Sequence, residues 1–121
     1  MRKDKAAEDY LEAIFQLSQE GQVTVSRLSD SLLVSKSAVT QMIGKLKEEN
    51  LVTQPYYGSI KLTSKGNDLG KKISERHKLL VNFLTFLGVT PEIAEKDACL
   101  MEHGLHEETI TQLLVFIDNN D

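Results

Sequence analysis

The sequence predicts a mainly α-helical protein with one small β-hairpin, and three observations lead to this fold class. Apolar residues recur at helical spacing through most of the 121 residues. Two short strand-like runs, 51–54 and 59–62, flank a turn that contains Pro55 and Gly58. Helical patterns end at Gly21, Gly88 and Gly104, as glycine commonly ends helices. In order, these elements predict two domains, residues 1–66 and residues 67–121.

The composition is typical of a soluble globular protein, with 40% hydrophobic and 26% charged residues. No run of about 18 apolar residues occurs, and no hydrophobic segment follows the charged start, so we expect neither a membrane span nor a signal peptide. The single cysteine, Cys99, cannot form an internal disulfide, which fits a reducing compartment. We therefore expect a cytoplasmic protein.

Charge is distributed unevenly along the chain. The formal net charge is −4, yet residues 27–65 carry six basic and three acidic side chains, whereas residues 67–121 carry five basic and ten acidic ones. This asymmetry suggests a DNA-facing part followed by an acidic part with another role.

Residues 4–19 are predicted to form an amphipathic helix with Leu11, Ile14 and Phe15 on its apolar stripe. Asp9 and Glu12 lie together about 140° around the helix from that stripe. For an isolated pair of acids, a solvated edge is the ordinary interpretation.

Residues 24–49 carry the pattern of a helix-turn-helix. Thr24 can cap a short first helix, and Ser35 can cap a second one after the connector 33–34. In the second helix an apolar face lies opposite a polar face that includes Gln41 and Gly44. A small polar face with a glycine for close approach suits a recognition helix in the major groove, where Gln41 can pair with an adenine edge. A plain solvent-exposed face is the alternative.

The predicted hairpin directly follows this second helix, which is the position of the wing in a winged helix. The combination favours DNA binding more than either pattern alone. The residues expected to contact bases or backbone are Arg27, Ser35, Lys36, Ser37, Thr40, Gln41, Lys45, Tyr57 and Lys61.

Three helices are predicted in the C-terminal domain. The first starts at Thr63 or Ser64, runs to about Phe86 and has His77 in the middle of its apolar face. Such a histidine is more often a core residue than a ligand, although a buried neutral imidazole is ready to bind a metal. The second begins at Pro91 and stops at Gly104. The third follows His106, to which we assign a structural role at the helix start.

The second of these helices carries three types of metal ligand on one face. Cys99, Glu102 and His103 have the spacing i, i+3 and i+4, which places them within an arc of roughly 100°. Thiolate, carboxylate and imidazole together suit Fe(II), Mn(II), Co(II) or Zn(II). Three ligands leave the coordination sphere incomplete, so further ligands are expected elsewhere.

Taken together, the winged helix, the segment Thr63-Ser64-Lys65-Gly66, the His77 helix and the run 97–103 resemble the diphtheria toxin repressor family. The resemblance covers essentially the whole chain and is greatest with the manganese transport regulator branch. It implies a metal-dependent repressor in which metal is held by Asp9, Glu12, His77, Glu102 and His103.

Cys99 departs from the pattern of that branch, which usually has a glutamate here, and matches the iron-responsive branch. The iron branch in turn typically has methionine in place of Asp9, and an ancillary glutamate and histidine where this chain offers Val81 and Glu95. The ligand set is therefore a hybrid. Mn(II) and Fe(II) are the candidate ions, with one or two per subunit.

The resemblance also implies a homodimer that binds palindromic double-stranded DNA, with the metal as co-repressor and genes of metal-ion uptake as targets. In metal-free protein the clustered carboxylates would repel one another. The nearest alternative is a winged-helix regulator that senses a small organic ligand in an apolar pocket. A di-metal carboxylate enzyme and a structural interaction module fit less well, because neither paired Glu-x-x-His motifs nor another catalytic constellation is present. We expect no enzymatic activity and no membrane partner.

Overall fold

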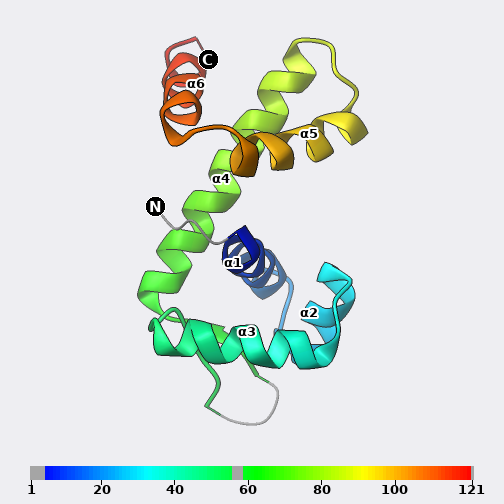
Figure 1. Cartoon of the computed structure of the whole chain (residues 1–121), viewed down its shortest axis with the longest axis vertical. Helices are drawn as coiled ribbons and strands as arrows, with labels where there is room; N and C mark the ends of the chain where they lie inside the picture. Colours follow the sequence, from blue (N-terminus) through cyan, green and yellow to red (C-terminus); the bar gives the residue numbers. More distant parts are fainter. Residues whose placement is uncertain (1–4, 56–58, 121) are drawn as a thin grey trace. The chain divides into compact units, whose positions relative to one another are not determined.

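The computed structural model describes residues 5–55 and 59–120, and within them the chain is mainly helical with one short hairpin (Figure 1). The predicted fold class is confirmed. The elements are α1 (Lys5–Ser18), α2 (Val25–Leu32), α3 (Lys36–Glu48), β1 (Val52–Thr53), β2 (Lys61–Leu62), α4 (Ser64–Phe86), α5 (Pro91–Gly104) and α6 (Glu107–Asn119).

The chain divides into two compact units, one up to Ser74 and the other from Glu75 onward. Helix α4 contributes residues to both units. Within the described part of the chain, no helix is long and apolar enough to cross a membrane.

The core of the first unit is built from the predicted apolar stripes of its helices. Leu11 and Ile14 of α1 are fully buried and pack in one cluster with Leu28 of α2 and Leu46 of α3. Ile73 of α4 joins the same cluster. Burial of these stripes stabilises helices that would be marginal in isolation.

Both predicted helix caps of the helix-turn-helix are confirmed. The Thr24 hydroxyl accepts a hydrogen bond from the Arg27 backbone N–H at 3.1 Å, and that of Ser35 accepts one from Ala38 at 3.0 Å. Between these caps, Leu33 adopts the left-handed conformation with φ 57° and is 90% exposed. A residue with a Cβ is strained there, so Leu33 stores a small amount of conformational energy in the turn.

The hairpin is short and antiparallel, with Val52 opposite Leu62 and Thr53 opposite Lys61. The segment before α2 extends it, because the Ile60 N–H donates to the Val23 carbonyl at 2.9 Å. The hairpin is thereby attached to the helix-turn-helix along one edge.

The start of α4 is fixed to the end of α3 through Thr63. Its hydroxyl donates to the Asn50 carbonyl at 2.7 Å and accepts from the Gly66 N–H at 3.0 Å, while its N–H donates to the Leu51 carbonyl at 3.0 Å. Gly66 must be glycine here, because a Cβ on it would lie 1.9 Å from the Leu51 carbonyl oxygen.

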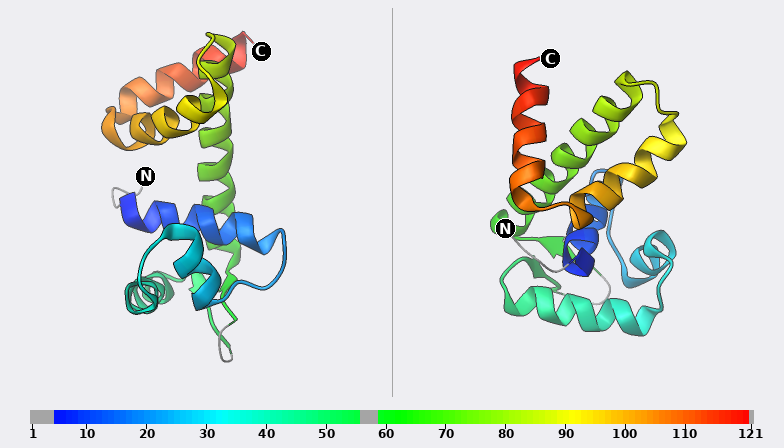
Figure 2. Two further views of the ribbon diagram at one scale, coloured as in Figure 1. Left: turned by 90° about the vertical axis from the view of Figure 1, so that its right-hand side faces the viewer. Right: turned by 45° about the horizontal axis from the view of Figure 1, so that its top comes forward.

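In the second unit the later part of α4 packs with α5 and α6 (Figure 2). Buried Leu80, Ala98 and Ile110, one from each helix, form its centre. Arg76 of α4 forms a two-pronged ion pair with Glu107 in the first turn of α6, with both N–O distances 3.4 Å. This pair connects the middle of α4 to the start of the last helix.

Candidate nucleic-acid interface and metal centre

The exposed face of α3 presents the predicted recognition surface. Ser37, Gln41 and Gly44 follow one another at spacing i, i+4 and i+7 and are all exposed, whereas Val39, Ile43 and Leu46 are buried. Lys36, Thr40 and Lys45 are exposed beside this stripe.

Two of the predicted hydroxyl contacts already have intramolecular partners. Ser35 accepts the capping hydrogen bond described above and keeps its O–H as a donor for a phosphate. Thr40 donates its hydroxyl to the Lys36 carbonyl at 3.0 Å. Ser35 is therefore better prepared to contact a phosphate oxygen than Thr40.

The remaining predicted DNA contacts are in different surroundings. The Arg27 guanidinium donates to the Gln22 carbonyl and lies 3.7 Å from a carboxylate oxygen of Glu20, so it holds the turn between α1 and α2. Lys61 is exposed on β2. Tyr57 lies outside the described residues.

Asp9 and Glu12, the acidic pair of α1, lie one helical turn apart and are both half-buried. The Lys5 ammonium lies 3.2 Å from a carboxylate oxygen of Asp9, and the Gln16 amide donates to Glu12 at 3.5 Å. Both contacts connect residues four apart on the helix surface, where such interactions are weak.

In the second unit, the His77 imidazole lies between two carboxylates. Its Nδ1 is 2.6 Å from Glu102 Oε1, and its Nε2 is 3.0 Å from Glu95 Oε1. The side chain of Glu102 is only 5% exposed and that of His77 14%, whereas Glu95 is largely open to solvent. His77 is thus a half-buried polar residue with acidic partners, and not a core histidine bonded to a carbonyl.

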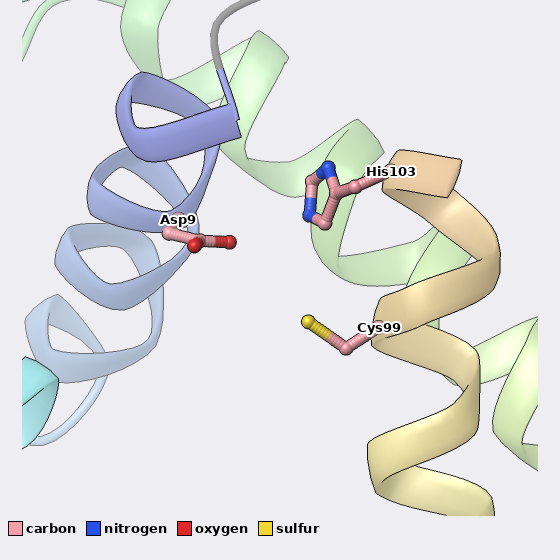
Figure 3. Close-up of side chains that lie close together, drawn as sticks. All are labelled: Asp9, Cys99 and His103. Atoms are coloured by element: carbon pink, nitrogen blue, oxygen red, sulfur yellow. The ribbon is translucent and has the colours of Figure 1, made fainter.

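Cys99 and His103 project from the same side of α5, one turn apart, and Figure 3 also draws Asp9 on α1. The Cys99 sulfur and a ring nitrogen of His103 lie within 4.8 Å of each other. Cys99 and His103 are each half-buried. The structure therefore places four of the six predicted ligands on α4 and α5 of the second unit as two pairs, His77 with Glu102 and Cys99 with His103.

The sequence reasoning missed two acidic residues. Glu95 was considered only because it stands where the iron-responsive branch has an ancillary ligand. Its spacing of i, i+4 and i+7 with Cys99 and Glu102 places it on the same face of the helix as these two residues, and its carboxylate contacts His77. Glu8 of α1 is buried, which no pattern indicated, because its position next to Ala7 on the helix looks like any charged surface site.

The donor set fits a divalent transition ion. On α4 and α5 these donors form two pairs, a thiol with an imidazole (Cys99 and His103) and an imidazole with a carboxylate (His77 and Glu102), and α1 carries two further carboxylates. Carboxylate and imidazole suit Mn(II) and Fe(II), whereas the sulfur is a softer ligand.

Two family models match the chain almost end to end. Residues 4–59 match the iron dependent repressor N-terminal DNA binding domain, and residues 63–121 match the iron dependent repressor metal binding and dimerisation domain. The chain belongs to the iron-dependent repressor family. The predicted resemblance to metal-dependent transcriptional regulators is confirmed.

Individual relatives agree with this assignment. The HTH-type transcriptional regulator MntR of Listeria monocytogenes is 42% identical over 108 residues, which cover 88% of this chain and 75% of that protein. The MntR of Bacillus subtilis is 41% identical over the same coverage. These relatives are transcriptional regulators.

Solved structures show the same fold at lower identity. The metal-dependent transcriptional regulator MtsR superposes with a TM-score of 0.81 at 26% identity, covering 98% of this chain and 55% of that chain. A manganese-dependent transcriptional repressor in complex with manganese gives 0.78 at 28%, covering 93% of this chain and 52% of that one. This chain therefore spans about half the length of these structures.

Proposed function

We propose that this chain is a transcriptional repressor that binds operator DNA as a homodimer when it holds Mn(II) or Fe(II), and that it controls genes of metal-ion uptake. The observation that carries the proposal is that His77 pairs with Glu102, and Cys99 lies beside His103, in a unit that matches a metal-binding domain. A separate unit with an exposed recognition helix matches a DNA-binding domain. Such a regulator would work in the cytoplasm, where its DNA is.

Six residues would hold one or two ions per subunit. His77, Cys99, Glu102 and His103 belong to the second unit, whereas Asp9 and Glu12 belong to the first. A bound divalent ion supplies positive charge that offsets the repulsion among the carboxylates. Metal binding would thereby favour the state of the protein that binds DNA.

Metal binding would change the hydrogen-bond and ion-pair partners of the ligand side chains. In the structure, Lys5 and Gln16 hold Asp9 and Glu12, while His77 holds Glu102. These contacts compete with an ion for Asp9, Glu12 and Glu102. The local contacts around the ligands therefore set a threshold that the metal concentration has to exceed.

The identity of the ion rests on Cys99. Manganese prefers oxygen and imidazole ligands, and Fe(II) accepts thiolate more readily. One of the solved structures named above is a manganese-dependent repressor in complex with manganese, which supports Mn(II), and the sulfur of Cys99 supports Fe(II). We therefore keep both ions in the proposal.

The second unit also offers a surface for a second copy. Its exposed apolar side chains include Leu100 of α5 at 68% and Phe116 of α6 at 54% exposure, together with Phe86 and Val115. Exposed large apolar side chains on a unit that matches a dimerisation domain support homodimer formation there. A two-fold dimer presents two recognition helices, as a palindromic operator requires.

The test is operator binding with and without metal. A duplex selected from a random pool by the Mn(II)-loaded protein should bind much more tightly in the presence of Mn(II) or Fe(II) than with chelator. His103→Ala should remove this metal response, whereas His106→Ala is the matched control, because His106 starts α6 without a side-chain capping bond. Equal DNA affinity with and without either ion would refute the proposal.

A further inference from the structure

Gly44 occupies an unusual place in the recognition helix. It lies in the middle of α3, on the same exposed stripe as Ser37 and Gln41, with ordinary helical backbone angles. A Cβ built on it meets nothing within 4 Å. The fold of this chain therefore leaves ample room for a side chain at this position.

Among the residues of the first unit that the structure describes, the other glycines have structural reasons that Gly44 lacks. A Cβ on Gly66 would collide with the Leu51 carbonyl, and one on Gly70 would come within 3.1 Å of α1. Gly21 has φ of +149°, a conformation that residues with side chains rarely adopt. None of these constraints applies to Gly44.

A glycine in this position weakens the helix. Relative to alanine, an exposed glycine in a helix interior lowers the folding equilibrium constant roughly fivefold, because the unfolded chain loses more freedom on folding. A residue that weakens the fold without a packing role is best explained by what α3 contacts.

We propose that Gly44 is a specificity-determining residue at which the backbone of α3 itself approaches the base edges of the operator. A helix with its side chains is about 10–12 Å across, and the major groove is about 12 Å wide, so the side chains on the inserted face set how deeply the helix enters. Without a side chain at residue 44, the helix lies deeper at the turn after Gln41. This brings the side chain of Gln41, one turn before Gly44, within reach of the bases. The inference rests on the proposed DNA binding.

The experiment compares Gly44→Ala with the original chain on a duplex selected by the original chain with Mn(II). We expect the variant to melt about 3 °C higher, because alanine is the better helix former. Its affinity for the selected duplex should nevertheless fall roughly tenfold, with the same dependence on salt, because no phosphate contact is lost. Its affinity for random duplex and its Mn(II) affinity should stay unchanged.

Gly104→Ala is the matched control, since Gly104 is an exposed glycine of α5 whose added Cβ also meets nothing within 4 Å. It should leave affinity for the selected duplex unaltered. A loss of less than about threefold for Gly44→Ala, or an equal loss on random duplex, would overturn the inference while leaving the proposed function in place. If the original chain selects no duplex, the proposed function itself fails, and this inference fails with it.

Discussion

Glu102→Gln should show how much the negative charge of Glu102 contributes to metal binding, because the substitution keeps the size of the side chain. The side chain of Glu102 is 5% exposed and meets the His77 ring at 2.6 Å. Glutamine keeps the size and can still offer an oxygen to the ring, so the metal-free variant should lose only about 1 kcal/mol, the difference between a charged and a neutral hydrogen bond. The folded state should survive.

The effect on metal binding should be much larger. At an ion concentration of 100 times Kd, binding stabilises the folded state by about 2.7 kcal/mol. If removal of the anionic ligand weakens binding about 100-fold, the same concentration contributes only about 0.4 kcal/mol. The metal-induced rise in Tm should therefore nearly vanish.

Thermal melts with Mn(II) and with chelator measure this difference directly, and titration calorimetry gives the affinities. Glu92→Gln is the matched control, because Glu92 is an exposed acid in the first turn of the same helix. A variant at Glu102 that keeps the full metal-induced rise in Tm would refute its assignment as a ligand.

Three further predictions concern the fold and the DNA surface. Gly66→Ala should destabilise the first unit by at least about 2 kcal/mol in chemical denaturation, because its Cβ would lie 1.9 Å from the Leu51 carbonyl oxygen; a change below 0.5 kcal/mol, on the order of a surface substitution, would contradict this. Leu33→Gly should stabilise the chain by roughly 0.5 kcal/mol, because relief of the left-handed strain slightly exceeds the added unfolded-state freedom, and a lower denaturation midpoint would count against it. Gln41→Ala should relax base preference at a cost of about 1–3 kcal/mol in DNA binding, with an unchanged dependence of affinity on salt concentration. Lys45→Ala should instead lower the affinity for all duplexes and reduce the slope of log affinity against log salt by about one. Binding titrations at several salt concentrations measure both effects, and the opposite pattern would contradict these roles.

Local sequence signals were sufficient for most of the fold. Thr24 and Ser35 cap the helices that they were expected to cap, and α5 runs from Pro91 to Gly104 as predicted. These signals work because caps, proline and glycine act within a few residues of the backbone that they affect. The predicted strands 51–54 and 59–62 are shorter in the structure, where pairing involves two residues on each side.

The site was predictable only in part. The spacing of Cys99, Glu102 and His103 fixes their common face on α5, since helix geometry alone decides it. The contacts of His77 depend instead on how α4 packs against α5. The apolar residues around His77 in the sequence favoured a position in the core over a position between carboxylates. The contact between His77 Nε2 and Glu95 Oε1, at 3.0 Å, also depends on this packing, because residue spacing within one helix does not determine which residue of another helix it meets.

The hydrogen bonds of Thr63 have a consequence for how the wing can evolve. They join Asn50, Leu51 and Gly66, so the chain between α3 and α4 is a loop whose two ends are held independently of its tip. The entropy of closing such a loop grows slowly, by about 0.6 kcal/mol for each doubling of its length. Insertions or new charges in the wing can therefore change which flanking DNA it reaches, while the recognition helix and the first turn of α4 keep their places.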